Sequence, residues 1–236
     1  ALMNDGNYGY KLDEGTCLWI DGADVTVGGC FSFYVHGNLH VSNAKSKLDA
    51  TETSQGIVYR TTANITIDAG TIETTMLRTS KADGTHVGSI TINDGTFILT
   101  GNGSDKHNFP TLGLTHTTSG FNMHGGYLVI ERGTDSGNAQ GWAFVIGSDK
   151  DNCSITGGTV RILGARWNNT NHDLYFTSTA PLWNLEIEGF NNNNRVEIRE
   201  FDDNGDSGCE DVEIQPLVVL NDLTIHNNGV LNANNQ

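Results

Sequence analysis

The chain has 236 residues, 28 of them acidic and 13 basic, which gives a formal net charge of −15 at pH 7. This balance argues against a nucleic-acid partner and against an anionic membrane surface, and no apolar run approaches the ~20 residues of a membrane span. Abundant Gly, Asn, Thr and Asp with few Lys is typical of extracellular bacterial proteins, so we expect a secreted or surface-attached protein without membrane insertion.

Residues 1–30 are the least regular part of the chain. We interpret them as an N-terminal cap or a first distorted coil, placed before a regular region at 31–236. Cys17 and Cys30 bracket two short apolar runs in a hairpin-like layout, which makes them a disulfide candidate. Spacing alone leaves the bond open, because the redox compartment and the geometry decide it.

From residue 33 onward a short phrase recurs, as in Ile65-Thr66-Ile67-Asp68-Ala69-Gly70-Thr71-Ile72. Each copy alternates apolar and polar residues with period two, which indicates strands. A glycine between the two runs allows a positive φ and a sharp turn. Copies start at residues 33, 65, 90, 121, 153, 185 and 223. The sequence therefore predicts an all-β fold: a right-handed parallel β-helix, or solenoid, of about seven coils with projecting loops.

Stacked coils place equivalent residues over one another, so the copies predict rows of side chains. The first predicted inward row is Phe33, Ile65, Ile90, Phe121, Cys153, Leu185 and Leu223. The second is Val35, Ile67, Ile92, Met123, Ile155, Ile187 and Ile225. The predicted outward row is Tyr34, Thr66, Thr91, Asn122, Ser154, Glu186 and Thr224. An antiparallel sandwich is the competing fold, but it does not explain a glycine that returns at one offset.

The final segment, 223–236, stops in the middle of this pattern. We therefore expect the native polypeptide to continue, which makes the chain a module of a longer protein.

One acidic loop has the spacing of a calcium site. Asp202, Asn204 and Asp206 show the 1-3-5 arrangement of oxygen ligands that calcium loops use. The loop lacks the Gly at position six and the Glu at position twelve of an EF-hand. Bound calcium is thus one interpretation, and a solvated acidic turn is the other.

Four residues are candidates for glycan binding. Trp167 and Arg166 lie in a polar loop, where an indole ring could stack on a sugar. Tyr127 is a second aromatic candidate. By the repeat register, His124 shares an outward row with Asp68, Asn93, Thr156, Glu188 and His226. Such a row could bind a ligand or form a structural ladder of hydrogen bonds.

No motif of a nucleophile elbow, a phosphate loop or a zinc protease is present, so the sequence names no catalytic residue. An enzyme remains the alternative, because acidic and basic residues could be neighbours on adjacent coils. These residues are Glu186, Glu188, Glu197, Arg161, Arg195 and Arg199. Ice binding through outward threonines is a third hypothesis, weakened by Asn122, Ser154 and Glu186 in the same row.

Two phrases carry a family resemblance: Ser89-Ile90-Thr91-Ile92-Asn93-Asp94-Gly95-Thr96-Phe97 and Leu220-Asn221-Asp222-Leu223-Thr224-Ile225. They resemble the secreted adhesin-like β-helix proteins of Bacteroidetes that pass through the type 9 secretion system. The resemblance implies a non-catalytic extracellular role in attachment, as a stalk or filament segment. Its partners would be a cell-surface or environmental polysaccharide, or other copies or segments of the parent protein. The scaffold is also similar to pectate-lyase-like enzymes, which implies a polysaccharide lyase or glycoside hydrolase as the alternative.

Overall fold

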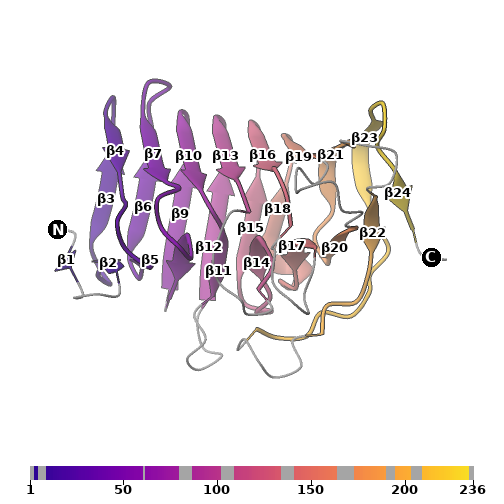
Figure 1. Cartoon of the computed structure of the whole chain (residues 1–236), viewed down its shortest axis with the longest axis horizontal. Helices are drawn as coiled ribbons and strands as arrows, with labels where there is room; N and C mark the ends of the chain where they lie inside the picture. The colour runs from indigo at the N-terminus through magenta and orange to yellow at the C-terminus, as the bar shows by residue number, and fades with distance from the viewer. Residues whose placement is uncertain are drawn as a thin grey trace.

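The computed structural model describes residues 3–4, 9–60, 62–79, 87–101, 109–133, 141–163, 173–189, 195–202 and 209–233. Within these residues the regular structure is β, apart from one short 3₁₀ turn at Lys150–Asn152. The strands form three long sheets, and every strand pair is parallel except one at the N-terminal edge. The fold is therefore a parallel β-helix, as the repeat predicts (Figure 1).

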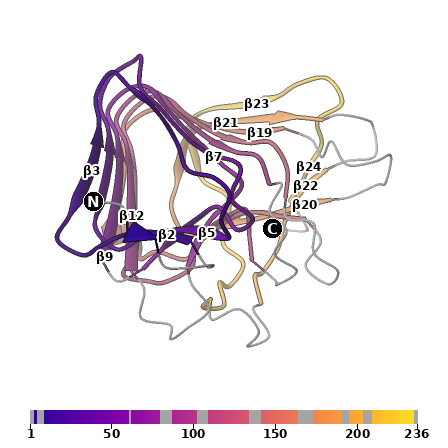
Figure 2. The same cartoon turned by 60° about the vertical axis from the view of Figure 1, so that its left-hand side comes forward.

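The three sheets are the walls of the solenoid (Figure 2). Sheet A contains, in spatial order, β1 (Met3–Asn4), β2 (Gly9–Leu12), β5 (Ser32–Val35), β8 (Ile57–Tyr59), β11 (Leu77–Thr79), β14 (Leu112–Leu114), β17 (Trp142–Ile146), β20 (Leu174–Ser178), β22 (Val196–Ile198) and β24 (Leu231–Asn232). Sheet B contains β3 (Cys17–Ile20), β6 (Asn38–Val41), β9 (Thr62–Ile67), β12 (Val87–Ile92), β15 (Gly120–Met123) and β18 (Cys153–Ile155). Sheet C contains β4 (Asp24–Thr26), β7 (Lys47–Ala50), β10 (Thr71–Thr74), β13 (Thr96–Leu99), β16 (Tyr127–Ile130), β19 (Thr159–Leu163), β21 (Leu182–Glu188) and β23 (Val219–Ile225).

Each coil runs from sheet A through sheet B to sheet C. Six successive coils contain all three strands, from β2, β3 and β4 to β17, β18 and β19. The seventh coil passes from β20 to β21 through residues 179–181, too short a link for a strand of sheet B. The eighth coil has β22 and β23, joined by a long excursion over residues 199–218. Sheet B therefore ends two coils before sheets A and C.

The N-terminal region is more regular than the sequence predicts. β2, β3 and β4 pair in parallel register with the second coil, so residues 9–26 form a complete first coil. Of the two interpretations of residues 1–30, the first coil is the one that describes residues 9–26, and this coil pairs in regular register. The irregular element is β1, which pairs antiparallel with β2 at the edge of sheet A.

The predicted rows are correct in their centre and wrong at both ends. Ile65, Ile90, Phe121 and Cys153 do align in sheet B. Phe33 instead pairs with Ile57 in sheet A, and its row neighbours Val35 and Tyr34 lie in the same strand. Residues 185–187 and 223–225 belong to sheet C, where Leu185 pairs with Leu223.

This register error has a simple physical cause. Strands of all three walls alternate apolar and polar residues in the same way. A glycine after a strand of sheet A or sheet C therefore produces the same sequence pattern as the sheet B phrase. Gly37 follows β5 and Gly189 follows β21, and both segments resemble the phrase for this reason. The true N-terminal members of the sheet B row are Leu18 and Leu39, and their outward neighbours are Trp19 and His40.

The corner between sheets B and C depends on stacked glycines. Gly70, Gly95 and Gly158 have φ of 86°, 82° and 84°. A Cβ on Gly95 would lie 2.5 Å from the carbonyl oxygen of Gly70, on the coil before it. The same oxygen accepts a hydrogen bond from the Thr96 backbone N–H at 2.8 Å. The phrase therefore keeps glycine because the coils approach too closely for a side chain.

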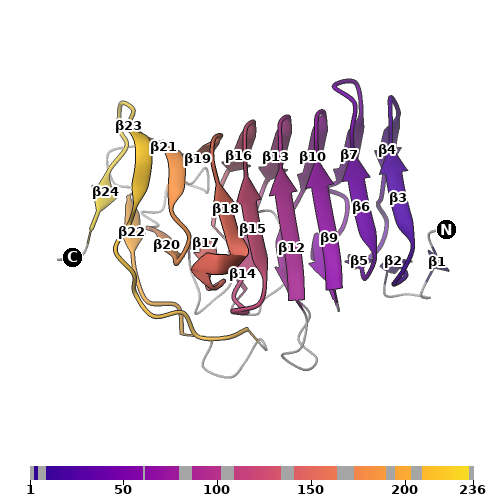
Figure 3. The ribbon, with the colours of Figure 1, turned by 180° about the vertical axis from the view of Figure 1, so that it is seen from behind.

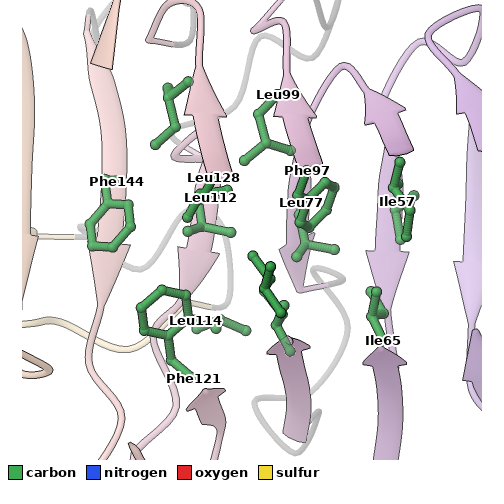
Figure 4. Packing of buried hydrophobic residues seen from close by; sticks show 14 of the residues in the cluster. Ile57, Ile65, Leu77, Phe97, Leu99, Leu112, Leu114, Phe121, Leu128 and Phe144 are labelled. Carbon is green, nitrogen blue, oxygen red and sulfur yellow. The ribbon is translucent and has the colours of Figure 1, made fainter. Parts of the chain in front are cut away.

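The interior is filled by stacked apolar side chains, as Figure 4 shows for ten labelled residues. Phe144 is fully buried, stacks on Phe176 with ring centroids 4.7 Å apart, and meets Phe121 edge to face at 6.0 Å. Burial of one such ring contributes roughly 1.5–3 kcal/mol. Ile67 and Ile92 are also fully buried, as the predicted inward rows require.

Candidate functional site

The outer face of sheet B carries hydroxyl, amide, imidazole and indole side chains. None of its six strands contains Asp, Glu, Lys or Arg, although the whole chain has a charge of −15. Figure 3 shows these strands side by side. The central outward row is Trp19, His40, Thr66, Thr91, Asn122 and Ser154. We refer to this surface as the sheet B face.

Hydrogen bonds between coils hold the side chains of the sheet B face in place. Asn64 Nδ2 donates to Asn38 Oδ1 at 3.1 Å, and Asn122 Nδ2 donates to Thr91 Oγ1 at 3.3 Å. Such inter-coil bonds fix rotamers before any ligand arrives. The side chains of these rows therefore form a preformed surface.

A second row begins where the sheet B strands end. Asn93 Nδ2 donates to Asp68 Oδ1 at 2.6 Å, and His40 Nε2 lies 2.7 Å from Asp68 Oδ2. The Asn93 amide and then the His40 ring hold the pKa of Asp68 below its usual value. Asp68, Asn93, His124 and Thr156 follow successive sheet B strands as predicted, but Glu188 and His226 lie at the end of sheet C.

Trp19 is the most exposed aromatic residue of the sheet B face. Its ring stacks on His40 with centroids 5.8 Å apart and planes 8° from parallel, and its Nε1 donates to Ser42 Oγ at 2.6 Å. Even so, 63% of Trp19 is exposed. The indole is thus fixed in position while most of it remains in solvent.

Two predicted glycan-binding residues lie on the corner between sheets B and C. His124 is exposed at the end of β15, and its Nδ1 lies 2.8 Å from Thr156 Oγ1. Tyr127 begins β16 and is 49% exposed. The other two candidates, Arg166 and Trp167, lie outside the described residues.

Charged side chains gather instead on the outer face of sheet C, where they pair between coils. Lys47 Nζ lies 2.8 Å from Glu73 Oε2 and 3.1 Å from Asp49 Oδ2. The hydrogen bonds that the Lys47 ammonium donates to Glu73 and then to Asp49 raise the pKa of Lys47. Arg161 contacts Glu186 at 3.5 Å and Glu188 at 2.6 Å. These groups form partly exposed ion pairs, each worth about 0.2–1 kcal/mol.

A third set of charges lies on sheet A near its C-terminal edge. Arg195 pairs with Asp173 at 2.9 Å and with Glu197 at 3.5 Å, and Arg199 pairs with Glu197 at 3.3 Å. The six residues suggested for catalysis thus divide between two sheets as ion pairs.

Residues 199–202 and 209–218, which we call the strap, pack on the outer face of sheet A at β17. Its described part runs from β22 back toward the middle of the rod (Figure 1). Phe201 and Val212 exchange backbone hydrogen bonds of 2.9 and 2.8 Å, and they pack with Trp142 and Val145 in a second apolar cluster. Phe201 is fully buried and lies 5.0 Å from Trp142, ring centroid to ring centroid.

Glu210 fastens the strap to the fifth coil. Its backbone N–H donates to Thr115 Oγ1 at 3.2 Å, and its Oε1 lies 3.2 Å from His116 Nε2. The Thr117 backbone N–H donates to Glu210 Oε2 at 3.4 Å. The strap therefore connects the eighth coil with the fifth.

Beside the strap lies an open pocket of about 450 Å³, lined by Trp142, Arg199, Glu200, Asp202 and Ile214. The Arg199 guanidinium sits 4.4 Å from the centroid of the Tyr175 ring. Sequence reasoning did not find this pocket. The only signal was the interval of 38 residues between the last two copies of the phrase, the longest in the chain.

The predicted calcium site is only partly visible. Asp202 is exposed and lines the pocket, whereas Asn204 and Asp206 lie outside the described residues. Among the described residues, no group of three His, Cys, Asp or Glu side chains is placed to hold a metal ion.

The structure contains no disulfide between Cys17 and Cys30, which corrects that candidate. Cys17 is an exposed free thiol in β3, and Cys30 is a half-buried free thiol just before β5. The Cys30 Sγ lies 3.5 Å from its acceptor, the Ser32 carbonyl oxygen, and burial raises the pKa of the thiol. The two residues belong to different walls, which the hairpin-like reading of 17–30 did not foresee.

Within the described part of the chain, no helix is long and apolar enough to cross a membrane. In comparisons with known proteins, no family model, curated protein or solved structure matches this chain. The sheet B face and the strap pocket are therefore interpreted from their own chemistry.

Proposed function

We propose that the protein is a non-catalytic extracellular surface module that binds glycans through the sheet B face. One observation carries the proposal: the six strands of sheet B contain no charged Asp, Glu, Lys or Arg in a strongly acidic chain. A neutral, hydrogen-bonding face suits a ligand rich in hydroxyl groups.

The geometry of the sheet B face matches this chemistry. Amides and hydroxyls both donate and accept hydrogen bonds, as sugar hydroxyls do. Their rows repeat at about the 4.8 Å separation of adjacent strands, so they present a regular array to an extended polymer. The inter-coil bonds of Asn64 and Asn122 reduce the entropy lost on binding. Trp19 adds an exposed ring on which a pyranose can stack.

The pocket beside the strap favours a second candidate, a polysaccharide lyase or glycoside hydrolase. It places Arg199, Glu200 and Asp202 around one hollow next to Trp142. Two carboxylates and a cation are the group types that such reactions use. This candidate assigns the reaction to the strap pocket and leaves the sheet B face without a catalytic role.

The two functions are separated by a glycan array combined with a depolymerisation screen, each with and without calcium. A non-catalytic module should bind a glycan on the array and release no depolymerisation product. Thr91→Lys would place a long cation on the sheet B face and is expected to reduce binding at least tenfold. Thr26→Lys, on an exposed strand of sheet C, is the matched control and should bind normally.

Product formation that is lost in Arg199→Ala would establish the enzyme instead. Absence of binding to any glycan, or equal binding by the Thr91→Lys and Thr26→Lys variants, would reject the sheet B face as the binding surface.

A further inference from the structure

Carboxylates border the sheet B face along the corner where the chain passes into sheet C. The residues that directly follow the sheet B strands lie in one row, because the strands pair in register up to their last residues. Asp21 and Asp68 belong to this row, and Asp94 lies one residue further round the corner. Asp21 and Asp94 are exposed, and the side chain of Asp68 is 42% exposed. The uncharged face therefore has a negatively charged border.

A hydrogen bond holds each of these three carboxylates in place. Asn43 Nδ2 donates to Asp21 Oδ1 at 3.1 Å, and Asn93 Nδ2 donates to Asp68 Oδ1 at 2.6 Å. The Gly95 backbone N–H donates to Asp94 Oδ1 at 2.8 Å. Both asparagines belong to the coil that follows their acceptor, so the bonds cross between coils. The negative charges therefore have fixed positions along the corner.

The opposite edge of sheet B, where the chain arrives from sheet A, is acidic as well. Its exposed carboxylates are Glu14, Asp149 and Asp151. Among the residues that the structure describes, the exposed Lys and Arg side chains on the two edges are Lys45 and Lys150. The half-buried Arg60 guanidinium is held 4.4 Å from the centroid of the Tyr34 ring, on sheet A. Negative charge therefore outweighs positive charge on both sides of the face.

The border charges are close enough to act on a ligand that lies on the central outward row. Side chains two residues apart in an extended chain, such as Thr66 and Asp68, are separated by about 7 Å. This separation is shorter than the Debye length of about 10 Å at 0.1 M salt. Two like charges about 7 Å apart in water lower a binding constant by roughly threefold. A polymer with a carboxylate on each sugar would meet several such charges.

We infer that the sheet B face selects uncharged glycans and excludes polyanionic ones, with Asp21, Asp68 and Asp94 as specificity-determining residues. The inference rests on the proposed function, since it names the class of glycan that the same face binds. The central rows offer hydrogen bonds to hydroxyl groups, while the border repels uronate and sulfate groups. Specificity of this kind comes from a penalty against the wrong ligand as well as from contacts with the right one.

A polycationic glycan is a poorer match to the same surface. Its amines would lie over the central rows, and the six strands of sheet B contain no Asp or Glu to pair with them. The carboxylates stand at the edges, where they act on every charged ligand at a distance and contact none along the centre of the face.

The test compares polymers that share a backbone and differ in charge. One pair is methyl-esterified polygalacturonate and its free acid, and the other is hydroxyethyl cellulose and carboxymethyl cellulose. Isothermal titration calorimetry gives the Kd of each polymer. At about 0.01 M salt the wild type should bind the neutral member at least about tenfold more tightly than the acidic member. At about 1 M salt, where the Debye length is about 3 Å, the two Kd values should approach each other.

A triple variant tests the three border carboxylates directly. The substitutions are Asp21→Asn, Asp68→Asn and Asp94→Asn, which remove the charges and keep an acceptor oxygen at each position. The ratio of the acidic to the neutral Kd at low salt should fall by about tenfold. A matched control removes the same charge away from sheet B and its edges, through Glu52→Gln, Glu131→Gln and Glu213→Gln. Its ratio should equal that of the wild type, and circular dichroism checks that both variants fold.

Equal or tighter binding of the acidic polymers by the wild type overturns the inference and leaves the sheet B face as a glycan-binding surface. A Kd ratio that is unchanged in the triple variant, or that falls equally in the control, also overturns it. So does a wild type that binds no member of either pair. The glycan array with the Thr91→Lys variant decides separately whether the proposed function stands.

Discussion

Sheets A and B share the same interior but differ on their outer faces. In sheet A both faces are covered: Val58, Arg78 and Val145 point outward, yet they are 1%, 3% and 0% exposed. In sheet B the outward positions alternate with buried ones along every long strand, as in β9 and β12. The repeat therefore determines that the inward side chains are apolar. The burial of the outward side chains depends on whether an inserted segment covers them.

The strap explains part of this difference, since it places Phe201 and Val212 on the outside of β17. Further along sheet A, the Phe109 ring covers Arg78, whose guanidinium carbon lies 3.9 Å from the ring centroid. A strand buried on both faces reads as a continuous apolar run, and Trp142-Ala143-Phe144-Val145-Ile146 is such a run. Among the described residues, the outer face of sheet B has no such cover along β9 and β12, as the proposed binding surface requires.

The largest expected effect is on the shared interior. Phe144→Ala should lower the free energy of unfolding by about 3–5 kcal/mol, because it removes a ring that stacks on Phe176 and meets Phe121. Chemical denaturation followed by circular dichroism measures this loss. A change below about 1 kcal/mol would contradict the packing described here.

A loss nearly as large is expected on the covered outer face of sheet A. Phe201→Ala should cost about 3 kcal/mol, since Phe201 is fully buried against Trp142. Thr91→Ala, at an outward position of sheet B, should change stability by less than about 0.5 kcal/mol. Equal losses in the two variants would show that the outer faces do not differ as proposed.

A smaller and local effect is expected where the strap is fastened. Glu210→Gln weakens the contact with His116, and it should cost about 1 kcal/mol or less because the group is partly exposed. Hydrogen exchange should therefore quicken at 209–218 while β9 and β12 remain protected. Unchanged exchange at 209–218 would mean that the strap is held by its apolar contacts alone.

The smallest effect is on the sheet B side and depends on pH. The pKa of Asp68 is lowered in the folded protein, so its stabilising contribution is present above the ordinary carboxyl pKa, roughly 4, and is lost as the pH falls through the lower folded value. Its side chain is 42% exposed, so solvent screens the effect.

Asp68→Asn should therefore cost less than about 1 kcal/mol at neutral pH. Urea unfolding at neutral and strongly acidic pH should show the difference from wild type shrinking in acid. If the stability difference between the wild type and the Asp68→Asn variant grows in acid, the ionised Asp68 does not stabilise the folded protein as described.

The fold and much of the core could be predicted because both follow from local periodicity. The strands of the sheet B phrases are recognisable from their alternation, and the corner glycines separate sheet B from sheet C in the four central copies. The assignment of a strand to a wall could not be predicted at the ends. Phe33 and Leu185 alternate like true members, and only the pairing between distant residues distinguishes them.

The candidate surfaces were harder to predict for the same reason. His124 could be placed by the repeat register, and Tyr127 follows it in the same copy of the phrase. The strap pocket brings Trp142 together with Arg199, and this proximity depends on a segment that folds back across coils. The predicted outward row contained Glu186, so the charge-free character of sheet B follows only from the pairing that places Glu186 in sheet C.

The strap also changes how the rod should respond to mechanical load. In an ordinary solenoid each repeat touches only its neighbours, so a pull on one end peels the repeats off singly. Here Glu210 ties the eighth coil to the fifth, past the two coils between them. Force applied at the C-terminal end must break the contacts of Glu210 with the fifth coil before those coils can unfold. The last third of the rod should therefore unfold as one unit.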